Sequence, residues 1–332
     1  MKFVDMFCGM GTIRMGFEQA GWECVYSIEW DKHKRKIYEV IFGNEPEGSD
    51  IRAIRNNDIP RADCWTFGAP CQDFSIAGTR SGLEGDRSSL IREVFRLVRE
   101  TEEEHRPEWL LYENVKGMLS SNKGLDYLEI LFEMESLGYD ISWQVLNSKD
   151  FGVPQNRERV FTLGHLRTRG SRKIFPIFGQ GNTNTTVGKS TETTVARTFT
   201  AGGHSGGNHS GMTIIEIAKM YPDRHSSLAN SILSIEGVSP TLDAMQGGNR
   251  QPKIEVKACL MPNSKTSCNQ ATLTQGKIRR LTPRECMRLQ GVADYITDKM
   301  ITAKISDSQM YRAAGDACTV NVLFEIAKKI KQ

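Results

Sequence analysis

Short apolar runs alternate with amphipathic helical patterns throughout the first 166 residues of the chain. Strands are expected at residues 3–7, 24–28, 64–67 and 109–112, and helices at residues 13–20, 90–98 and 125–137. This order is typical of an α/β fold, in which parallel strands form a doubly wound sheet with helices on both faces. Ligands of such sheets bind at the carboxyl ends of the strands. We therefore expect the functional residues to follow directly after the strands.

The character of the sequence changes after about residue 170. Residues 179–211 contain eight glycines among many Thr, Ser and Asn residues, and helical periodicity returns only at about Arg279. A helix is expected to start near Pro283, and a second, amphipathic one to span residues 320–331. We predict a larger domain at residues 1–175, a smaller domain of strands and loops at 176–278, and a segment at 279–332 that returns to the larger domain.

Composition is ordinary for a soluble enzyme, with 39% hydrophobic and 25% charged residues. No apolar run approaches the roughly 18 residues that cross a bilayer. The N-terminus lacks the apolar stretch of a signal peptide, so we expect a cytoplasmic protein. The net charge is +3, with ten Lys/Arg against six Asp/Glu between residues 170 and 275. This local excess fits contact with DNA, and it fits a solvated loop equally well.

Eight cysteines stand singly in the chain, at positions 8, 24, 64, 71, 259, 268, 286 and 318. The absence of a Cys-x-x-Cys pair argues against a zinc ribbon or a dithiol centre, and we expect no metal. Thiols stay reduced in the cytosol, so each cysteine is available for chemistry.

A glycine turn, Phe7-x-Gly9-x-Gly11, joins the first expected strand to the first helix. Glycines let the backbone approach a ligand, and the helix N-terminus then points at it. A tight turn with no ligand has the same pattern. Arg14 stands where a dinucleotide-binding turn has its third glycine, which makes S-adenosylmethionine a better fit than a nicotinamide dinucleotide.

Acidic and aromatic residues after the second strand fit the rest of such a cofactor. Glu29 can accept hydrogen bonds from two ribose hydroxyls, and Trp30 offers a flat face for an adenine. Asp50 and Ile51 begin a loop that could reach the adenine edge.

Cys71 follows the third expected strand, in a loop that Pro70 stiffens. An isolated cysteine is usually a buried core residue. However, Glu113 ends the next strand, so the thiol and the carboxyl group can face one substrate ring.

Gln155, Arg157 and Arg159 alternate in a segment that we expect to be extended, which places them on one face. Their two guanidinium groups could hold an anion or a carbonyl oxygen. An exposed charged strand has the same pattern.

Six motifs follow one another in the chain: Phe7-x-Gly9-x-Gly11, Glu29-Trp30, Pro70-Cys71-Gln72, Glu113-Asn114-Val115, Gln155-x-Arg157-x-Arg159, and Arg280-Leu281-Thr282-Pro283-Arg284-Glu285 through Arg288-Leu289-Gln290-Gly291. In order and spacing they resemble the DNA (cytosine-5) methyltransferase family. The resemblance covers about residues 1–166 and 279–324, and that family places its target recognition domain in the remaining middle part. It implies a Rossmann-like sheet, S-adenosylmethionine as cofactor and double-stranded DNA as substrate.

The resemblance also implies a role for each catalytic residue. Cys71 would attack carbon 6 of a cytosine and so make carbon 5 nucleophilic. Glu113 would hydrogen-bond ring nitrogen 3 and the exocyclic amine. Arg159 would contact the cytosine carbonyl oxygen, and Arg157 would help to orient the loop that carries the thiolate. The cytosine has to leave the duplex for this chemistry.

The predicted binding residues form two sets. Cofactor contacts are expected from Phe7, Gly9, Gly11, Glu29, Trp30, Asp50, Ile51 and Pro70, and DNA contacts from Gln72, Ser75, Arg80, Arg87, Thr241 and Arg250. Residues 75–87 are the expected loop that closes over the flipped base. Asp316 stands where the family has an asparagine in its cofactor pocket, which leaves its role open.

The sequence disfavours three other functions. A tRNA cytosine-5 methyltransferase of the same fold would carry a Cys-Phe-Thr signature, which is absent. A catalytically silent DNA-binding relative would lack Cys71, Glu113 or Glu29. Methylation of an exocyclic amine would need an Asp/Asn-Pro-Pro-Tyr/Phe loop where Ala69-Pro70-Cys71-Gln72 stands. We therefore expect a nucleoid-associated cytoplasmic monomer of a restriction-modification system, with a possible endonuclease that acts on the same site.

Overall fold

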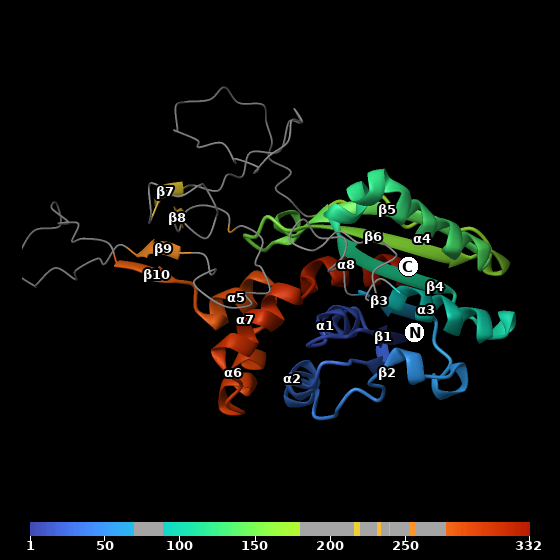
Figure 1. Cartoon of the computed structure of the whole chain (residues 1–332), viewed down its shortest axis with the longest axis horizontal. Coiled ribbons are helices and arrows are strands. Elements are labelled where there is room, and N and C mark those ends of the chain that lie inside the picture. Colours follow the sequence, from blue (N-terminus) through green and yellow to red (C-terminus); the bar gives the residue numbers. More distant parts are fainter. Residues whose placement is uncertain (70–88, 180–215, 220–230, 234–238, 240–252, 257–276) are drawn as a thin grey trace, which may run out of the picture.

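The computed structural model describes residues 1–69, 89–179, 216–219, 231–233, 239, 253–256 and 277–332 (Figure 1). The strands of its larger sheet are β1 (Lys2–Met6), β2 (Glu23–Ile28), β3 (Cys64–Phe67), β4 (Trp109–Val115), β5 (Tyr139–Asn147) and β6 (Glu158–Leu166). The helices are α1 (Thr12–Gln19), α2 (Lys32–Phe42), α3 (Ser89–Glu100), α4 (Leu125–Ser136), α5 (Pro283–Leu289), α6 (Asp294–Thr302), α7 (Asp307–Asp316) and α8 (Val320–Lys331). The expected strand at residues 64–67 and the expected helix at 320–331 are confirmed.

The larger sheet is parallel in one part and mixed in the other. Its order is β2-β1-β3-β4-β6-β5. Strands β2, β1, β3 and β4 are parallel, as expected, whereas β6 runs antiparallel to both of its neighbours. The prediction of parallel strands therefore holds for β2, β1, β3 and β4 and is wrong for the pairs that β6 forms with β4 and β5. The link from β5 to β6 has only ten residues, too few for the helical crossover that parallel neighbours need.

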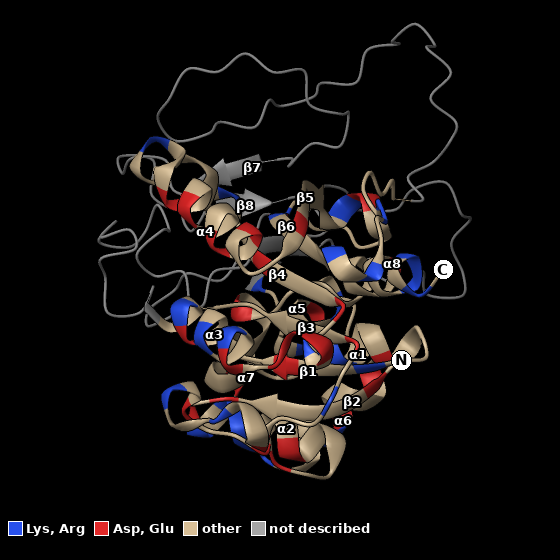
Figure 2. Ribbon diagram, turned by 90° about the vertical axis from the view of Figure 1, so that its right-hand side faces the viewer, with Lys and Arg blue, Asp and Glu red and all other residues tan. Residues whose placement is uncertain are grey.

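Helices cover both faces of this sheet, so the strands are buried on both sides (Figure 2). On one face Val4 and Met6 pack with α3 and α4. On the other face Phe3 packs with α1 and α8. This arrangement confirms the expected α/β class and leaves the carboxyl ends of the strands as the place where loops can form a site.

The last helix of the chain packs on the first. Gly16 of α1 makes this close approach possible, because a Cβ there would lie 2.7 Å from the Cβ of Leu323 and 2.9 Å from the carbonyl oxygen of Val320. The indole nitrogen of Trp22 also donates a hydrogen bond to the carbonyl oxygen of Ala327 at 3.1 Å. The C-terminal segment is thus part of the larger unit.

A third apolar cluster joins α2 to α5, α6 and α7. The short strands β7 (Glu216–Lys219), β8 (Ser231–Leu233), β9 (Lys253–Val256) and β10 (Lys277–Arg280) form a second sheet in the order β10-β9-β8-β7. Ser239 pairs with Gln155 in an isolated parallel bridge, so the chain between β8 and β9 reaches the link from β5 to β6. Within the described residues, no helix is both long and apolar enough to span a membrane.

Candidate active site

The turn after β1 contains three residues with left-handed backbone, Phe7 (φ 62°), Gly9 (φ 59°) and Gly11 (φ 83°). Gly11 immediately precedes α1, and a Cβ at that position would lie 2.3 Å from a ring carbon of Phe42. At Gly9, by contrast, a Cβ would meet no atom within 4 Å. The backbone beside Gly9 is therefore open, near the N-terminus of α1, where a ligand can approach the main chain.

Glu29 follows β2 and holds this turn in place. Its two carboxylate oxygens accept hydrogen bonds from the backbone N–H of Gly9 at 2.8 Å and of Asp31 at 2.7 Å. Glu29 is 7% exposed. Since each carboxylate oxygen has two lone pairs, both can still accept a hydrogen bond from a hydroxyl group. The backbone thus fixes the carboxylate in an orientation that a ribose could use.

Trp30, Asp50 and Ile51 lie together beyond β2, where Arg52 connects them. The guanidinium carbon of Arg52 is 5.2 Å from the centre of the Trp30 ring, and Arg52 pairs with Asp50 at 2.9 Å. This hydrogen bond lowers the pKa of Asp50. Trp30 is 64% exposed and so presents its ring, whereas Ile51 packs in the core. The Ile51 side chain therefore supports this edge and does not present a surface to a ligand.

Glu113 and Arg159 meet where β4 and β6 pair. Because Glu113 is opposite Phe161 and Arg159 is opposite Val115, the two side chains are diagonal neighbours on one face. Arg159 Nε lies 3.1 Å from Glu113 Oε1, and the side chains are 14% and 15% exposed. Burial raises the pKa of Glu113, although the Arg159 and Arg157 cations oppose this shift. A buried carboxyl group with a raised pKa can donate a proton as well as accept one.

The end of β3 lies against this pair. A Cβ on Gly68 would be 3.2 Å from Oε2 of Glu113. Cys71 follows three residues later, outside the described residues. The other predicted site residues outside the described residues are Pro70, Gln72, Ser75, Arg80, Arg87, Thr241 and Arg250.

Arg157 and Arg159 make different contacts, although their spacing predicts a shared face. Arg157 is 1% exposed, and its Nη2 donates hydrogen bonds to the carbonyl oxygens of Gly315 at 2.8 Å and Ala317 at 2.7 Å. Burial, reinforced by the neighbouring Arg159 cation, lowers the pKa of Arg157 to about 9. Of the three residues expected in one extended segment, only Arg159 lies in a strand, because β6 begins at Glu158 and so after Gln155 and Arg157. Arg157 therefore joins the start of β6 to the end of α7.

Asp316, between those two carbonyl groups, pairs with Lys34 of α2 at 2.8 Å. Burial disfavours the charged form of Lys34, but Asp316 and Glu29 outweigh it and raise the pKa of Lys34. Sequence reasoning missed Lys34. A signal did exist, because Asp31 accepts hydrogen bonds from the first turn of α2, which puts Lys34 at the same sheet edge as Glu29.

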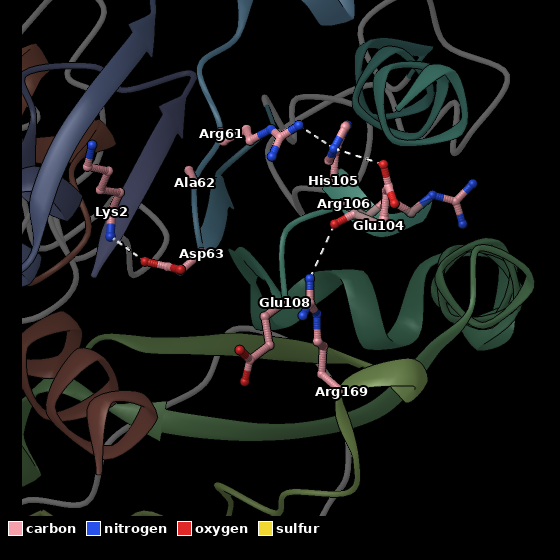
Figure 3. A pocket seen from close by; sticks show the side chains of 9 residues that line it. All are labelled: Lys2, Arg61, Ala62, Asp63, Glu104, His105, Arg106, Glu108 and Arg169. Carbon is pink, nitrogen blue, oxygen red and sulfur yellow. Dashed lines mark hydrogen bonds and ion pairs between the residues drawn. The ribbon is translucent and has the colours of Figure 1, made fainter. Parts of the chain in front are cut away.

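A separate pocket of about 280 Å³ opens at the opposite edge of the sheet, beside the first residues of β1, β3 and β4 (Figure 3). Its charged groups bind one another: Asp63 accepts a hydrogen bond from the backbone N–H of Lys2, and Arg61 contacts His105. None of the predicted site residues lines it. The candidate active site is therefore the carboxyl edge, as expected from the fold.

Comparison with known proteins gives consistent results for sequence and structure. The family model for C-5 cytosine-specific DNA methylases matches residues 1–332. The type II methyltransferase M.HhaI of Haemophilus parahaemolyticus is 32% identical over 99% of this chain and 94% of its own length. M.DsaV of Dactylococcopsis salina is 30% identical over 99% of this chain and 86% of its own length.

Solved structures share the fold at low sequence identity. The Dnmt2 methyltransferase of S. pombe superimposes with a TM-score of 0.68 at 18% identity, over 99% of this chain and 98% of its own. A putative DNA modification methyltransferase from an E. coli prophage has a TM-score of 0.63 at 18% identity, over 100% and 98%. Both likenesses support the fold alone. From the match of the family model along its whole length, the chain belongs to the C-5 cytosine-specific DNA methylases.

Proposed function

We propose that this chain methylates carbon 5 of a flipped-out cytosine, within a specific sequence of double-stranded DNA, through a covalent adduct between Cys71 and carbon 6. Methylation of that carbon in DNA, with S-adenosylmethionine as the donor, is the reaction of its family. The covalent route and the residues assigned to it are our proposal. The observation that carries this proposal is the Glu113–Arg159 pair. Glu113 lies at the carboxyl end of β4, and the neighbouring strand β3 leads to Cys71.

Chain geometry supports Cys71 as the nucleophile. Gly68 lies against Glu113, and three extended residues span about 10 Å, so the thiol can come within reach of a ring held by Glu113. The described cysteines suit this role poorly, because burial raises the pKa of each of them: Cys8, Cys24, Cys64, Cys286 and Cys318. A thiol attacks as its thiolate, and a raised pKa makes that form rare.

The reaction needs groups that hold the cytosine while bonds change. The Cys71 thiolate forms a bond to carbon 6, and the electron pair displaced from the 5,6 double bond makes carbon 5 nucleophilic. Glu113 donates a proton to nitrogen 3 during this attack, and Arg159 hydrogen-bonds the carbonyl oxygen. After methyl transfer, a base removes the proton from carbon 5, the 5,6 double bond returns, Cys71 leaves as its thiolate, and nitrogen 3 gives its proton back to Glu113. Arg157 holds the segment that carries Arg159.

The turn after β1 and the end of β2 fit the proposed cofactor. S-adenosylmethionine supplies an electrophilic methyl group when bound. Open space beside Gly9 allows the main chain to approach it, and Glu29 retains lone pairs for ribose hydroxyls. Trp30 offers an exposed ring for the adenine, and we assign Asp50 to the edge of the adenine.

DNA binding is assigned to parts of the chain outside the described residues. We propose that Gln72, Ser75, Arg80 and Arg87 contact the flipped nucleotide and its strand, and that Thr241 and Arg250 belong to the target recognition domain at residues 176–278. The enzyme acts as a cytoplasmic, nucleoid-associated monomer, with a restriction endonuclease of the same target as its functional counterpart. Type II methyltransferases among its relatives support this assignment.

The test has two stages. Bisulfite sequencing of DNA and of RNA from cells that express the chain should reveal one methylated DNA sequence; methylation confined to RNA would contradict the proposal. An oligonucleotide with 5-fluorocytosine at that position should then form a covalent adduct in the presence of the cofactor, because fluorine blocks the final proton removal. Cys71→Ser should abolish the adduct, whereas the matched control Cys24→Ser should retain it. An adduct in Cys71→Ser would identify a different nucleophile.

A further inference from the structure

Four buried side chains form a continuous chain of hydrogen bonds behind the candidate active site. The hydroxyl groups of Ser148 and Thr319 share a hydrogen bond at 2.8 Å, Thr319 donates to Gln290 at 3.1 Å, and Gln290 donates to Gln155 at 3.1 Å. Their exposed fractions are between 0% and 3%. The four residues come from three separate parts of the sequence, so the chain forms only when those parts are correctly packed.

Two members of the network also form backbone hydrogen bonds that join separate elements. The carbonyl oxygen of Gln290, at the end of α5, accepts a hydrogen bond from Val320, the first residue of α8, at 2.9 Å. The backbone N–H of Ser148 donates to the carbonyl oxygen of Arg157 at 3.0 Å. The side-chain network therefore connects the start of α8 to the link between β5 and β6.

The link between β5 and β6 contacts the proposed reaction centre on one side and the segment that contains Ser239 on the other. Arg157 holds the carbonyl groups of Gly315 and Ala317, and two residues further on Arg159 holds Glu113. On the other side, the backbone of Ser239 bonds to that of residues 154 and 156, at 2.8 and 2.9 Å. A displacement of Gln155 would thus pass to both arginines and to the chain that leads into the proposed DNA-binding residue Thr241.

We propose that Thr319 and Gln290 are positioning residues for the reaction: by holding Gln155, they set where Arg159 meets the cytosine and anchor the proposed target recognition segment. This inference rests on the function proposed above. Buried polar groups are costly to leave unpaired, so the network favours one arrangement of the segment. A small error in placement matters, because catalysis is sensitive to displacements of about 1 Å.

Thr319→Val tests this, since it removes one hydroxyl and keeps the side-chain shape. The rate constant of methyl transfer in a single turnover should fall on the order of tenfold or more. It is measured per active molecule, counted with the 5-fluorocytosine adduct, well below the unfolding temperature. Thr319→Ser keeps the hydroxyl and should restore the rate. Ser148→Ala removes the hydroxyl that contacts Thr319 and the carbonyl oxygen of Arg157, but it leaves the bonds from Thr319 to Gln290 and from Gln290 to Gln155 in place, so it should reduce the rate less.

Thr297→Val is the matched control. Thr297 is 0% exposed, lies in α6, and its hydroxyl has no hydrogen-bond partner among the described residues. Its replacement should leave the rate constant unchanged. Equal rate constants for wild type, Thr319→Val and Ser148→Ala would overturn the inference, as would a loss in Thr297→Val as large as that in Thr319→Val. If Thr319→Val does not fold, Ser148→Ala against Thr297→Val decides.

The wild-type enzyme separates the two proposals. If it forms no adduct with 5-fluorocytosine DNA and methylates no DNA, the proposed function fails before any variant is compared. If it is active and the network variants transfer methyl groups as fast as wild type, only the positioning role fails.

Discussion

The Glu113 carboxylate accepts an ion-pair contact from Arg159 at 3.1 Å across an antiparallel strand pair, while the next strand on the other side leads to Cys71. This ion pair thus joins the carboxyl end of β4 to the amino end of β6, which runs antiparallel to it. Burial and the two arginines act on the same carboxyl group with opposite effects on its pKa, and the balance leaves that pKa raised.

Removing the Arg159 cation should change both the rate and its pH dependence. In Arg159→Met we expect a loss on the order of 100-fold in kcat/KM, because the proposed hydrogen-bond donor to the cytosine oxygen is removed. The pKa of Glu113 should rise further without this cation. Because protonated Glu113 is the proposed proton donor, the alkaline limb of the pH–rate profile should move to higher pH. Arg167→Met, which removes a surface arginine paired with Asp140, should change neither quantity; an unmoved limb in Arg159→Met would contradict the role of Glu113 as proton donor.

Glu29→Gln should weaken cofactor binding. A glutamine side chain has one acceptor oxygen, so it can keep only one of the two backbone hydrogen bonds that hold the carboxylate. We expect the dissociation constant for S-adenosylmethionine to rise roughly tenfold to 100-fold, as measured by calorimetry. Glu45→Gln, an exposed acidic residue that pairs with Arg35, is the control and should bind normally.

Lys34 and Asp316 should be coupled in cofactor binding. Lys34→Met leaves Asp316 without its ion-pair partner beside the proposed cofactor site, and we expect affinity to fall about tenfold, equivalent to roughly 1.4 kcal/mol. Adding Asp316→Asn to this variant should recover most of the loss. A double-mutant cycle of the four dissociation constants measures the coupling, and purely additive effects would show that the ion pair has no part in binding.

Asp5 should make stability depend on pH in an unusual direction. It is fully buried in β1, and burial raises its pKa from 3.8 to about 7, although a hydrogen bond from Thr66 opposes the shift. Since the folded protein favours the protonated form, this contribution to stability is fully present below pH 3.8 and is lost as the pH rises through about 7. The difference is about 4 kcal/mol at most.

Asp5→Asn removes that titration. The variant should be more stable than wild type at pH 8, and the gap should narrow at pH 5, as measured by denaturant unfolding. Asp140→Asn, which changes an exposed aspartate, is the reference. Parallel stability curves for wild type and Asp5→Asn between pH 5 and 8 would contradict the assignment.

The parts of the fold that sequence could predict are those in which local pattern and tertiary packing agree. The strand at residues 64–67 is apolar in sequence and buried on both faces, and α8 has an apolar stripe that meets α1. Strand β6 begins with Glu158-Arg159-Val160-Phe161, so its first residues are charged although the strand is buried, and one of its two partners, β4, lies more than 40 positions away in the sequence.

In the candidate active site, too, local sequence patterns predicted some residues, whereas contacts between distant parts of the chain could not be predicted. Glu29 and Glu113 were predictable, because acidic residues directly after apolar runs lie at the carboxyl edge of the sheet. The contacts of Arg157 with Gly315 and Ala317, and of Lys34 with Asp316, were not. Each joins residues more than 150 positions apart, and periodicity carries no information about such distances.

The packing of α8 on α1 has a consequence for how the protein is made. Trp22 and Ala327, which are joined by a hydrogen bond, are 305 positions apart. While a ribosome synthesises the chain, the apolar face of α1 lacks its cover until α8 has emerged. Contacts over such separations form slowly. The turn after β1, which α1 supports, should therefore acquire its final rigidity only after α8 has emerged from the ribosome.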